Sequence, residues 1–369
     1  MKSVLHFTIA FITSFFLLPA VHAHEISSAY LTLEKDSNSE LSGLLFLRPF
    51  DLEQSLLIDS DKNGELTWAE VKQHEREIAN MVKATLTVFD RQNVCPFSTS
   101  SLATATVGGQ LLIAIPLTFR CDSSKQIGVN YQGFFNIDKS HKLLISVNYG
   151  DKTLSNVITT TKRQITFTDQ SHSQWSTFIT FVKEGVIHIW IGVDHILFLL
   201  ATLLTVNLAR SNRRWVPINK VKDIFKQTLY IVTAFTLAHS MTLTATALGW
   251  IQTNSRYVEF GIALSVLLTA LNNIWPIVYR IGWITFAFGL LHGMGFASVF
   301  ADLNANQNNL VLTVGAFNLG VEIGQLAIVA IIFPLLIWAR KGNIYPKYIM
   351  PATSSVVALT ALTWAIQRW

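Results

Sequence analysis

Hydrophobic and polar positions divide the chain into three stretches with different patterns. Residues 1–23 hold a short apolar run behind a lysine, and residues 24–170 alternate between apolar and polar positions over short segments. Residues 175–369 carry long apolar runs separated by short polar loops. Alternation is typical of strands that bury one face, whereas about 20 consecutive apolar residues can cross a bilayer as a helix. The pattern therefore predicts a signal peptide, an exported β-rich domain and a transmembrane helical domain.

The exported domain, residues 24–170, is predicted to have a β-sandwich-like fold. It contains seven short segments rich in β-branched and aromatic residues, which favour strands. Gly108-Gly109 and Gly150-Asp151 supply turns in front of two of these segments. Short strands in this number are typical of two packed sheets. The predicted strands cover residues 28–33, 41–47, 84–89, 111–119, 128–133, 142–149 and 154–160.

Six long apolar segments predict a six-helix transmembrane bundle in residues 175–369. The chain of 369 residues is 50% hydrophobic and 14% charged, whereas soluble domains contain about 25% charged residues. The lipid bilayer is therefore the expected surrounding of this half of the protein. The predicted spans cover about residues 178–207, 228–250, 258–278, 281–300, 310–339 and 348–366.

Charged residues in the loops predict the orientation of the spans. Basic residues such as Arg213, Arg280 and Lys341 follow the first, third and fifth spans, whereas the opposite loops carry few charges. The positive-inside rule places these basic loops in the cytoplasm and the exported domain in the periplasm, as in a protein of the bacterial inner membrane. Because topology accounts for the net charge of +5, that charge does not indicate a nucleic-acid partner.

Cys95 and Cys121 are the two cysteines of the chain, and both lie in the exported segment. An oxidising periplasm allows a pair of cysteines at this spacing to form a disulfide. Two widely separated thiols do not supply a cysteine-based metal site. We therefore expect a structural disulfide between them.

Residues 59–70, DSDKNGELTWAE, match the twelve-residue loop of an EF-hand. Oxygen-bearing side chains occupy positions 1, 3 and 5, glycine occupies position 6, and glutamate occupies position 12. The glycine permits the sharp turn, and the last glutamate can offer both oxygens to a hard cation. Residues 68–82 are predicted to form the exiting helix, and an acidic turn without metal is the alternative. The expected calcium ligands are Asp59, Asp61, Asn63, Glu65 through its carbonyl, and Glu70.

Titratable residues interrupt the first predicted span, where residues 185–200 read GVIHIWIGVDHILFLL. Each costs about 2.5 to 3.5 kcal/mol at the centre of a bilayer unless it faces a protein interior. On one straight helix His188 and His195 share a stripe, about 10 Å apart along the axis, with Gly192 between them. Asp194 either binds beside His195 or orients an imidazole of another helix.

Later spans add further titratable groups, namely His239 in the second, His292 in the fourth and Glu322 in the fifth. Imidazole suits nickel, cobalt, copper and zinc, and a neighbouring carboxylate raises its basicity. The sequence therefore predicts a site for a divalent transition metal (Ni, Co or Zn). The alternative is that each histidine pairs with a polar group of a neighbouring helix and binds nothing. The predicted ligands are His188, Asp194, His195, His239, His292 and Glu322.

The run His188-x5-Asp194-His195 resembles the HX5DH motif in the first span of the HupE/UreJ family. These are membrane proteins associated with nickel or cobalt uptake for hydrogenase and urease. The resemblance continues through His239-Ser240, Glu259, His292-Gly293 and residues 318–325, over about residues 175–366. The signal peptide, the periplasmic domain and the six spans resemble the larger branch of that family. The resemblance implies that the histidines and the aspartate of the first span contact the metal.

Three functions follow from these observations. The leading one is inward transport of a nickel- or cobalt-type cation along the His/Asp/Glu path, which makes the protein a transporter rather than an enzyme. The second is an intramembrane zinc hydrolase, in which Glu322 or Asp194 activates water and Ser240 or Ser265 stabilises an intermediate. The third is a non-catalytic assembly or sensory protein whose periplasmic domain binds a protein partner.

Overall fold

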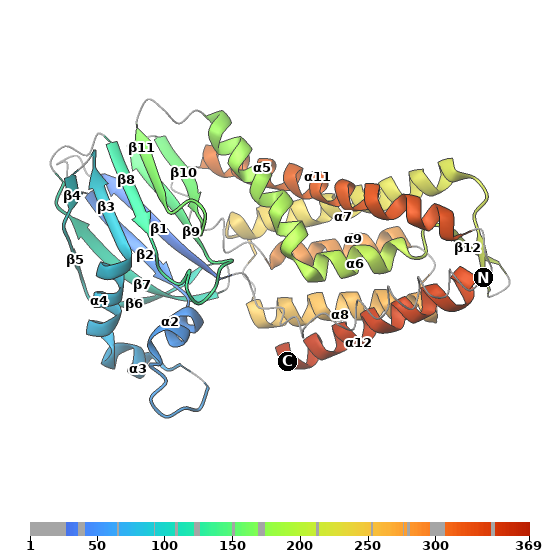
Figure 1. Ribbon diagram of the computed structural model, residues 1–369, viewed down its shortest axis with the longest axis horizontal. Helices are drawn as coiled ribbons and strands as arrows, with labels where there is room; N and C mark the ends of the chain where they lie inside the picture. The colour runs from blue at the N-terminus through green and yellow to red at the C-terminus, as the bar shows by residue number, and fades with distance from the viewer. Residues whose placement is uncertain are drawn as a thin grey trace.

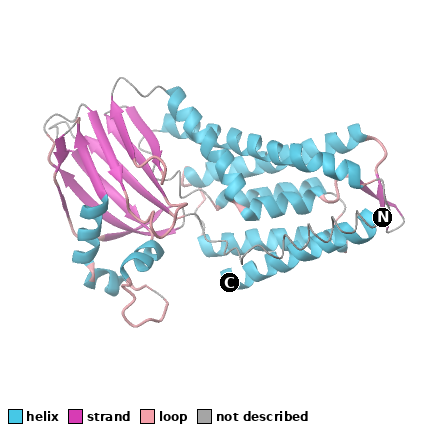
Figure 2. Ribbon diagram, in the orientation of Figure 1, coloured by secondary structure: helices cyan, strands magenta, loops and turns pink. Residues whose placement is uncertain are grey.

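The structure, a computed structural model, has a β-sheet region followed by a helical region (Figures 1 and 2). The predicted signal peptide, Glu65 of the acidic loop and the turns at residues 108–109 and 150–151 lie outside the residues that it describes. The described residues are 27–35, 41–64, 66–91, 93–107, 110–121, 126–149, 152–168, 174–211, 214–251, 254–275, 277–278, 281–295, 307–340 and 344–369.

The larger sheet has seven strands in the order β10-β9-β1-β2-β7-β5, with β6 paired to β7. Strand β1 runs parallel to β9 and antiparallel to β2, so that Leu31 lies opposite both Ile145 and Leu45. The remaining neighbours are antiparallel. The strands are β1 (Ser28–Lys35), β2 (Leu41–Leu47), β5 (Phe97–Thr99), β6 (Ala103–Val107), β7 (Gln110–Phe119), β9 (Lys142–Tyr149) and β10 (Lys152–Ile158).

The smaller sheet has four antiparallel strands in the order β11-β8-β3-β4. Alternate residues of both sheets enter one hydrophobic core, with Leu33 and Ile115 from the larger sheet and Val129 and Phe167 from the smaller. All four side chains are buried, as the alternating sequence pattern requires. The strands are β3 (Leu86–Asp90), β4 (Asn93–Cys95), β8 (Gln126–Tyr131) and β11 (Gln164–Thr168).

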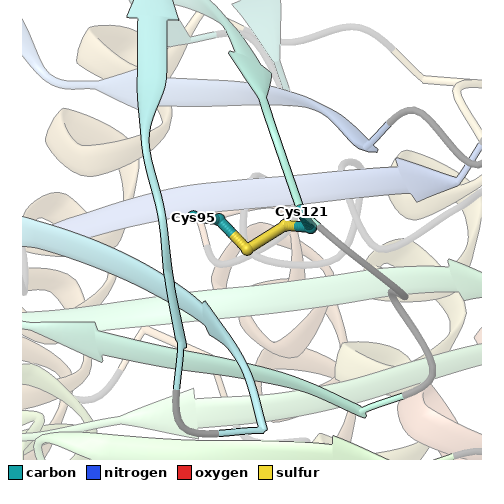
Figure 3. The surroundings of a disulfide bond; sticks show 2 residues. All are labelled: Cys95 and Cys121. Carbon is teal, nitrogen blue, oxygen red and sulfur yellow. A yellow bond between two sulfur atoms is a disulfide. The ribbon is translucent and has the colours of Figure 1, made fainter.

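The predicted disulfide is confirmed and joins the two sheets (Figure 3). Cys95 ends β4 of the smaller sheet, and Cys121 follows β7 of the larger, with 4.9 Å between their Cα atoms. The bond closes a loop with a sequence separation of 26 residues. On a chain-entropy model a loop of this length stabilises the fold by about 3 to 4 kcal/mol.

The acidic loop lies between helices α2 (Pro49–Leu56) and α3 (Trp68–Gln73). The exiting helix is shorter than predicted, because His74 leaves helical geometry and α4 (Glu75–Thr85) begins after it. Thr67 begins α3 with a capping box, in which its hydroxyl accepts the N–H of Glu70 and its own N–H donates to the Glu70 carboxylate. The loop is thus held at its end by side chains of its own.

One buried histidine, His141, belongs to the core of the β-sheet region. Its Nδ1 lies in hydrogen-bond contact with Ser27 and its Nε2 with the Tyr131 hydroxyl. Burial lowers the pKa of His141 to about 4, so the ring is neutral at pH 7. Because both ring nitrogens have partners, this histidine is a structural residue rather than a metal ligand.

Among the described residues, the helical region contains three helices that are long and apolar enough to cross a membrane, and a fourth candidate if one bent pair is a single span. Two further helices pack among them, and a short hairpin, β12 (Leu208–Ser211) with β13 (Arg214–Pro217), follows the bent pair. The six-span bundle stays a prediction. The helices are α5 (Gln174–Ile191), α6 (Val193–Leu203), α7 (Val221–Ala247), α8 (Ser255–Ile274), α9 (Ile281–Met294), α11 (Gln307–Ala339) and α12 (Met350–Arg368), with a π-helical turn at Tyr345–Ile349 before α12.

The first predicted span is not one straight helix, because α5 and α6 meet at Gly192 with a bend of 70°. Gly192 has an extended ψ of 93°. Its N–H donates to the His188 carbonyl in the last turn of α5, and its carbonyl accepts the N–H of Ile196 in the first turn of α6. A Cβ atom at this position would lie 2.7 Å from Nδ1 of His195 and 2.8 Å from the His188 carbonyl oxygen. The bend therefore requires glycine.

Helices pack in three close pairs, α5 with α11, α7 with α9 and α8 with α12. The first pair meets at Gly185 and Gly320, where a Cβ on Gly320 would lie 2.0 Å from the Val182 carbonyl oxygen. Small residues at such contacts let two helix backbones approach closely. The larger sheet packs against this region, since Leu144 of β9 and Phe181 of α5 belong to one hydrophobic cluster.

Candidate metal centre

Four histidines from four helices come together inside the helical region. His188 of α5, His195 of α6 and His239 of α7 each offer a ring nitrogen, and these nitrogens lie within 4.8 Å of one another. His292 of α9 lies beside them, with its ring centroid 5.0 Å from that of His195. All four side chains are buried. The group has the donor type and the spacing that can hold a transition metal.

The bend at Gly192 assembles this group. The ring centroids of His188 and His195 are 4.7 Å apart, so the separation of about 10 Å expected on a straight helix is wrong. The 70° turn of the chain folds the last turn of α5 against the first turn of α6. Two residues that a straight helix would place at different depths thereby come close enough to bind the same ion.

Three of the imidazoles are held through Nδ1. Nδ1 of His195 donates to Oδ1 of Asp194 at 2.9 Å, and Nδ1 of His239 donates to Oδ1 of Asn318 at 3.3 Å. Nδ1 of His292 donates to the Phe288 carbonyl oxygen at 2.8 Å. Each bond fixes the orientation of the ring and leaves the lone pair on Nε2.

The Nε2 atoms of these three histidines are buried and have no hydrogen-bond partner among the residues that the structure describes. A buried polar atom without a partner costs about 1 to 3 kcal/mol, so native structures rarely leave one. His195, His239 and His292 share this feature within one small volume. A bound cation would satisfy all three lone pairs at once.

Glycines of α9 bring His292 into the group. A Cβ on Gly293 would lie 2.2 Å from the His239 carbonyl oxygen, and one on Gly289 would lie 2.8 Å from the Phe235 carbonyl oxygen. Helix α9 therefore contacts the backbone of α7 directly on both sides of His292. Small residues at these positions let the two helices approach closely around the site.

A family model described as HupE / UreJ protein matches residues 162–368. The chain belongs to the HupE/UreJ family. The matched region begins just before the last strand of the β-sheet region and includes all four histidines, whereas the acidic loop lies outside it. A search of curated proteins finds no match.

Other residues predicted for this HupE/UreJ site have different places in the structure. Oδ1 of Asp194 accepts hydrogen bonds from the backbone N–H and from Nδ1 of His195, its neighbour in the chain, and so orients that ring. Glu322 is half-buried on α11 and is not among the groups that lie within 4.8 Å of one another in the described chain. The hydroxyls of Ser240 and Ser265 donate to the carbonyls of Thr236 and Ile262, within their own helices.

Asn318 is the site residue whose role sequence reasoning missed. It shares a helix face with Glu322 and Gln325, and the charge of the glutamate singles that residue out in the sequence. In the structure it is Asn318 that contacts His239, while Oε1 of Gln325 accepts the hydroxyl of Thr236 one turn away. The two amides thus line the contact between α11 and α7.

A second group of possible ligands lies in the acidic loop of this HupE/UreJ protein. Carboxylate oxygens of Asp59, Asp61 and Glu70 lie within 4.8 Å of one another. Gly64 has a φ of +83°, as the sharp turn requires, and its N–H donates to Asp59. The backbone N–H and the hydroxyl of Thr67 lower the pKa of Glu70 to about 2, so its carboxylate is ionised at neutral pH.

Proposed function

We propose that this HupE/UreJ protein carries a divalent transition metal of the nickel or cobalt type across the bacterial inner membrane. The observation that supports this function most is the set of three buried Nε2 lone pairs, each on a ring held through Nδ1. The fourth imidazole, His188, completes a donor set of nitrogen atoms. Such donors favour nickel, cobalt, copper and zinc over magnesium and calcium.

Two features favour transport over hydrolysis. The site is built at a break between two helix segments, α5 and α6, and discontinuous helices near the middle of the membrane are typical of transporter sites. A zinc hydrolase would need an acid free to activate a water on the ion. Glu322 lies outside the close group, and Oδ1 of Asp194 already accepts the backbone N–H and the Nδ1–H of His195. The hydroxyls of Ser240 and Ser265 donate to carbonyls of their own helices.

In this proposal the residues act in order along the path. His188, His195, His239 and His292 take the ion from water, and Asp194 raises the basicity of His195. Glu322 lies on α11 between Asn318 and Gln325, one turn beyond the contact with His239. We assign it to the release of the ion on the cytoplasmic side, because a carboxylate binds these ions less tightly than clustered imidazoles do.

The proposed topology has six spans with the β-sheet region in the periplasm. The bent pair α5–α6 forms the first span, and α7, α8, α9, α11 and α12 form the others. Charge asymmetry of the loops supports this orientation. The confirmed disulfide supports export of the β-sheet region, since such bonds form in oxidising compartments.

Metal analysis of the purified protein, followed by uptake into vesicles, tests the transport function. We expect about one equivalent of Ni²⁺ or Co²⁺ to bind and exchange with free ion, and vesicles that contain the protein to accumulate it. Zn²⁺ held at one equivalent without exchange, together with no uptake of any of the three ions, would contradict transport and support the hydrolase.

We infer that the acidic loop binds one Ca²⁺ as a structural ion. The oxygens of Asp59, Asp61 and Glu70 converge, and Asn63 and the carbonyl of Glu65 occupy the remaining ligand positions of the loop pattern. The loop lies at the side of the β-sheet region, between α2 and α3 (Figure 1). A single loop of this kind in an exported domain has an expected Kd of about 10⁻⁴ to 10⁻³ M.

Glu70→Gln should weaken Ca²⁺ binding about tenfold or more, because the substitution removes the charge and one oxygen of the bidentate ligand. Titration calorimetry with Ca²⁺ measures the change. Glu77→Gln makes the same substitution on α4, outside the loop, and should bind as the native protein does. Equal Kd values for the native protein and both variants would show that the loop is an acidic turn without an ion.

A further inference from the structure

One ion pair joins the β-sheet region to the helix that carries His188. The Lys142 ammonium, on β9, donates to the carboxylate of Glu184 on α5. Both side chains are 14% exposed, which is far more buried than the 37% and 35% of the surface pair Lys72–Glu75. A buried charge is costly unless it is paired, so each of these two residues requires the other.

The pair lies one turn of α5 away from His188, where the helix contacts the β-sheet region. Glu184 precedes His188 by four residues on α5, and positions four apart share a face with about 5 to 6 Å between their Cβ atoms. Helix α5 contacts β10 of the larger sheet and packs along α11, so it joins the β-sheet region to the helices around the metal centre (Figure 1).

The pair differs from an ordinary tether in its chemistry. The hydrophobic cluster that contains Leu144 of β9 and Phe181 of α5 already holds the larger sheet against this helix. A carboxylate one turn from a set of neutral nitrogen donors is a ligand for the same cation, and an ammonium in contact with that carboxylate competes with the cation. The Glu184 carboxylate therefore attracts the cation, and the Lys142 ammonium in contact with it repels the cation.

We propose that Glu184 is the outer binding residue of the metal path and that Lys142 closes it. The periplasmic domain thereby acts as the gate of this HupE/UreJ protein. An incoming divalent cation takes the place of the ammonium on the Glu184 carboxylate and then passes to His188, one turn further along the same face. This inference rests on the proposed transport function and deepens it.

The proposal predicts effects of opposite sign for the two partners. Lys142→Met leaves the carboxylate without its competitor, so the Kd for Ni²⁺ should fall about tenfold or more. Glu184→Gln leaves the ammonium alone near the site, so the Kd should rise by a similar factor. The double variant removes both charges and should lie between the two single variants, near the native value. Initial rates of Ni²⁺ uptake should follow the same order.

Titration of the full-length protein with Ni²⁺ in detergent measures these constants, and thermal unfolding checks that each variant is folded. Lys72→Met removes the same charge from the surface pair and should leave the Kd unchanged. Lys142→Gln removes the charge but keeps a side chain that can donate to the Glu184 carboxylate, so it should lower the Kd as Lys142→Met does and provides a second test if Lys142→Met does not fold.

A structural tether predicts a different result, in which both single variants bind more weakly because the domain and α5 separate. Such changes of equal sign, or unchanged Kd values in both, would overturn the gate while the metal centre stands. A native protein that binds no Ni²⁺, Co²⁺ or Zn²⁺ would overturn the proposed function and this inference together.

Discussion

His195→Ala should reduce the affinity for Ni²⁺ by more than about a hundredfold, beyond the 10- to 100-fold range typical for residues that only orient a ligand. His195 is central to the site, with ring centroids 4.7 Å from His188 and 5.0 Å from His292. Its removal deletes one nitrogen ligand and leaves Asp194 without its ring partner. Uptake into vesicles should fall to the level of vesicles without protein.

Two further variants separate the contributions to this effect. Asp194→Asn keeps an oxygen that accepts the Nδ1–H of His195 but removes the charge, so we expect the Ni²⁺ affinity to fall about tenfold. His74→Ala makes the same truncation in the β-sheet region, where His74 contacts Glu77, and should leave the Kd unchanged. Native-like affinity of His195→Ala, in protein shown to be folded by thermal unfolding, would mean that the histidines only pack helices together.

Local signals made much of this structure predictable. Each of the seven predicted strands overlaps an observed strand, because alternation over six or more residues is a strong signal. The strands missed are short or weakly patterned, as β4 and β5 show with three residues each. Each histidine of the site could be predicted as a candidate ligand by itself, since a titratable residue in an apolar span is rare and usually functional.

The bend at Gly192 could not be predicted in the same way. Apolar residues lie on both sides of Gly192 in residues 185–200, and an isolated glycine is often tolerated inside a helix. Asp194 offers a weak signal, because acidic residues are common in the first turn of a helix. The geometry of the site depends on this bend, so the sequence predicted which histidines take part but not how they meet.

Contacts between side chains that are far apart in the chain could not be predicted from the sequence either. His239 and Asn318 are 79 residues apart, and Lys142 and Glu184 are 42 residues apart. A single chain gives the residue types on each helix face but not the rotation of one helix against another. Glu322 was therefore predicted as a ligand from its charge, whereas the packing of α11 turns Asn318 toward His239.

The close contact between α5 and α11 gives the second large effect. Gly320→Ala places a Cβ 2.0 Å from the Val182 carbonyl oxygen, which is backbone and cannot move aside. We expect a loss of about 1 to 3 kcal/mol in stability, as for other overpacked interiors. Metal affinity should fall as well, because α11 carries Asn318 and a shift of this helix releases the His239 ring. Thermal unfolding in detergent and Ni²⁺ titration measure the two effects.

Gly315→Ala is the matched control on the same helix, since a Cβ at Gly315 meets nothing within 4 Å. Alanine favours a helix over glycine by about 0.5 to 1 kcal/mol, so this variant should be as stable as the native protein or more so. Gly185→Ala, across the contact from Gly320, should reproduce the loss, because its Cβ would lie 2.1 Å from the Phe317 carbonyl oxygen. If Gly320→Ala and Gly315→Ala behaved alike, α11 would not hold the ring of His239 through its contact with α5, and that ring would have to be positioned by other contacts of α7, such as those with α9.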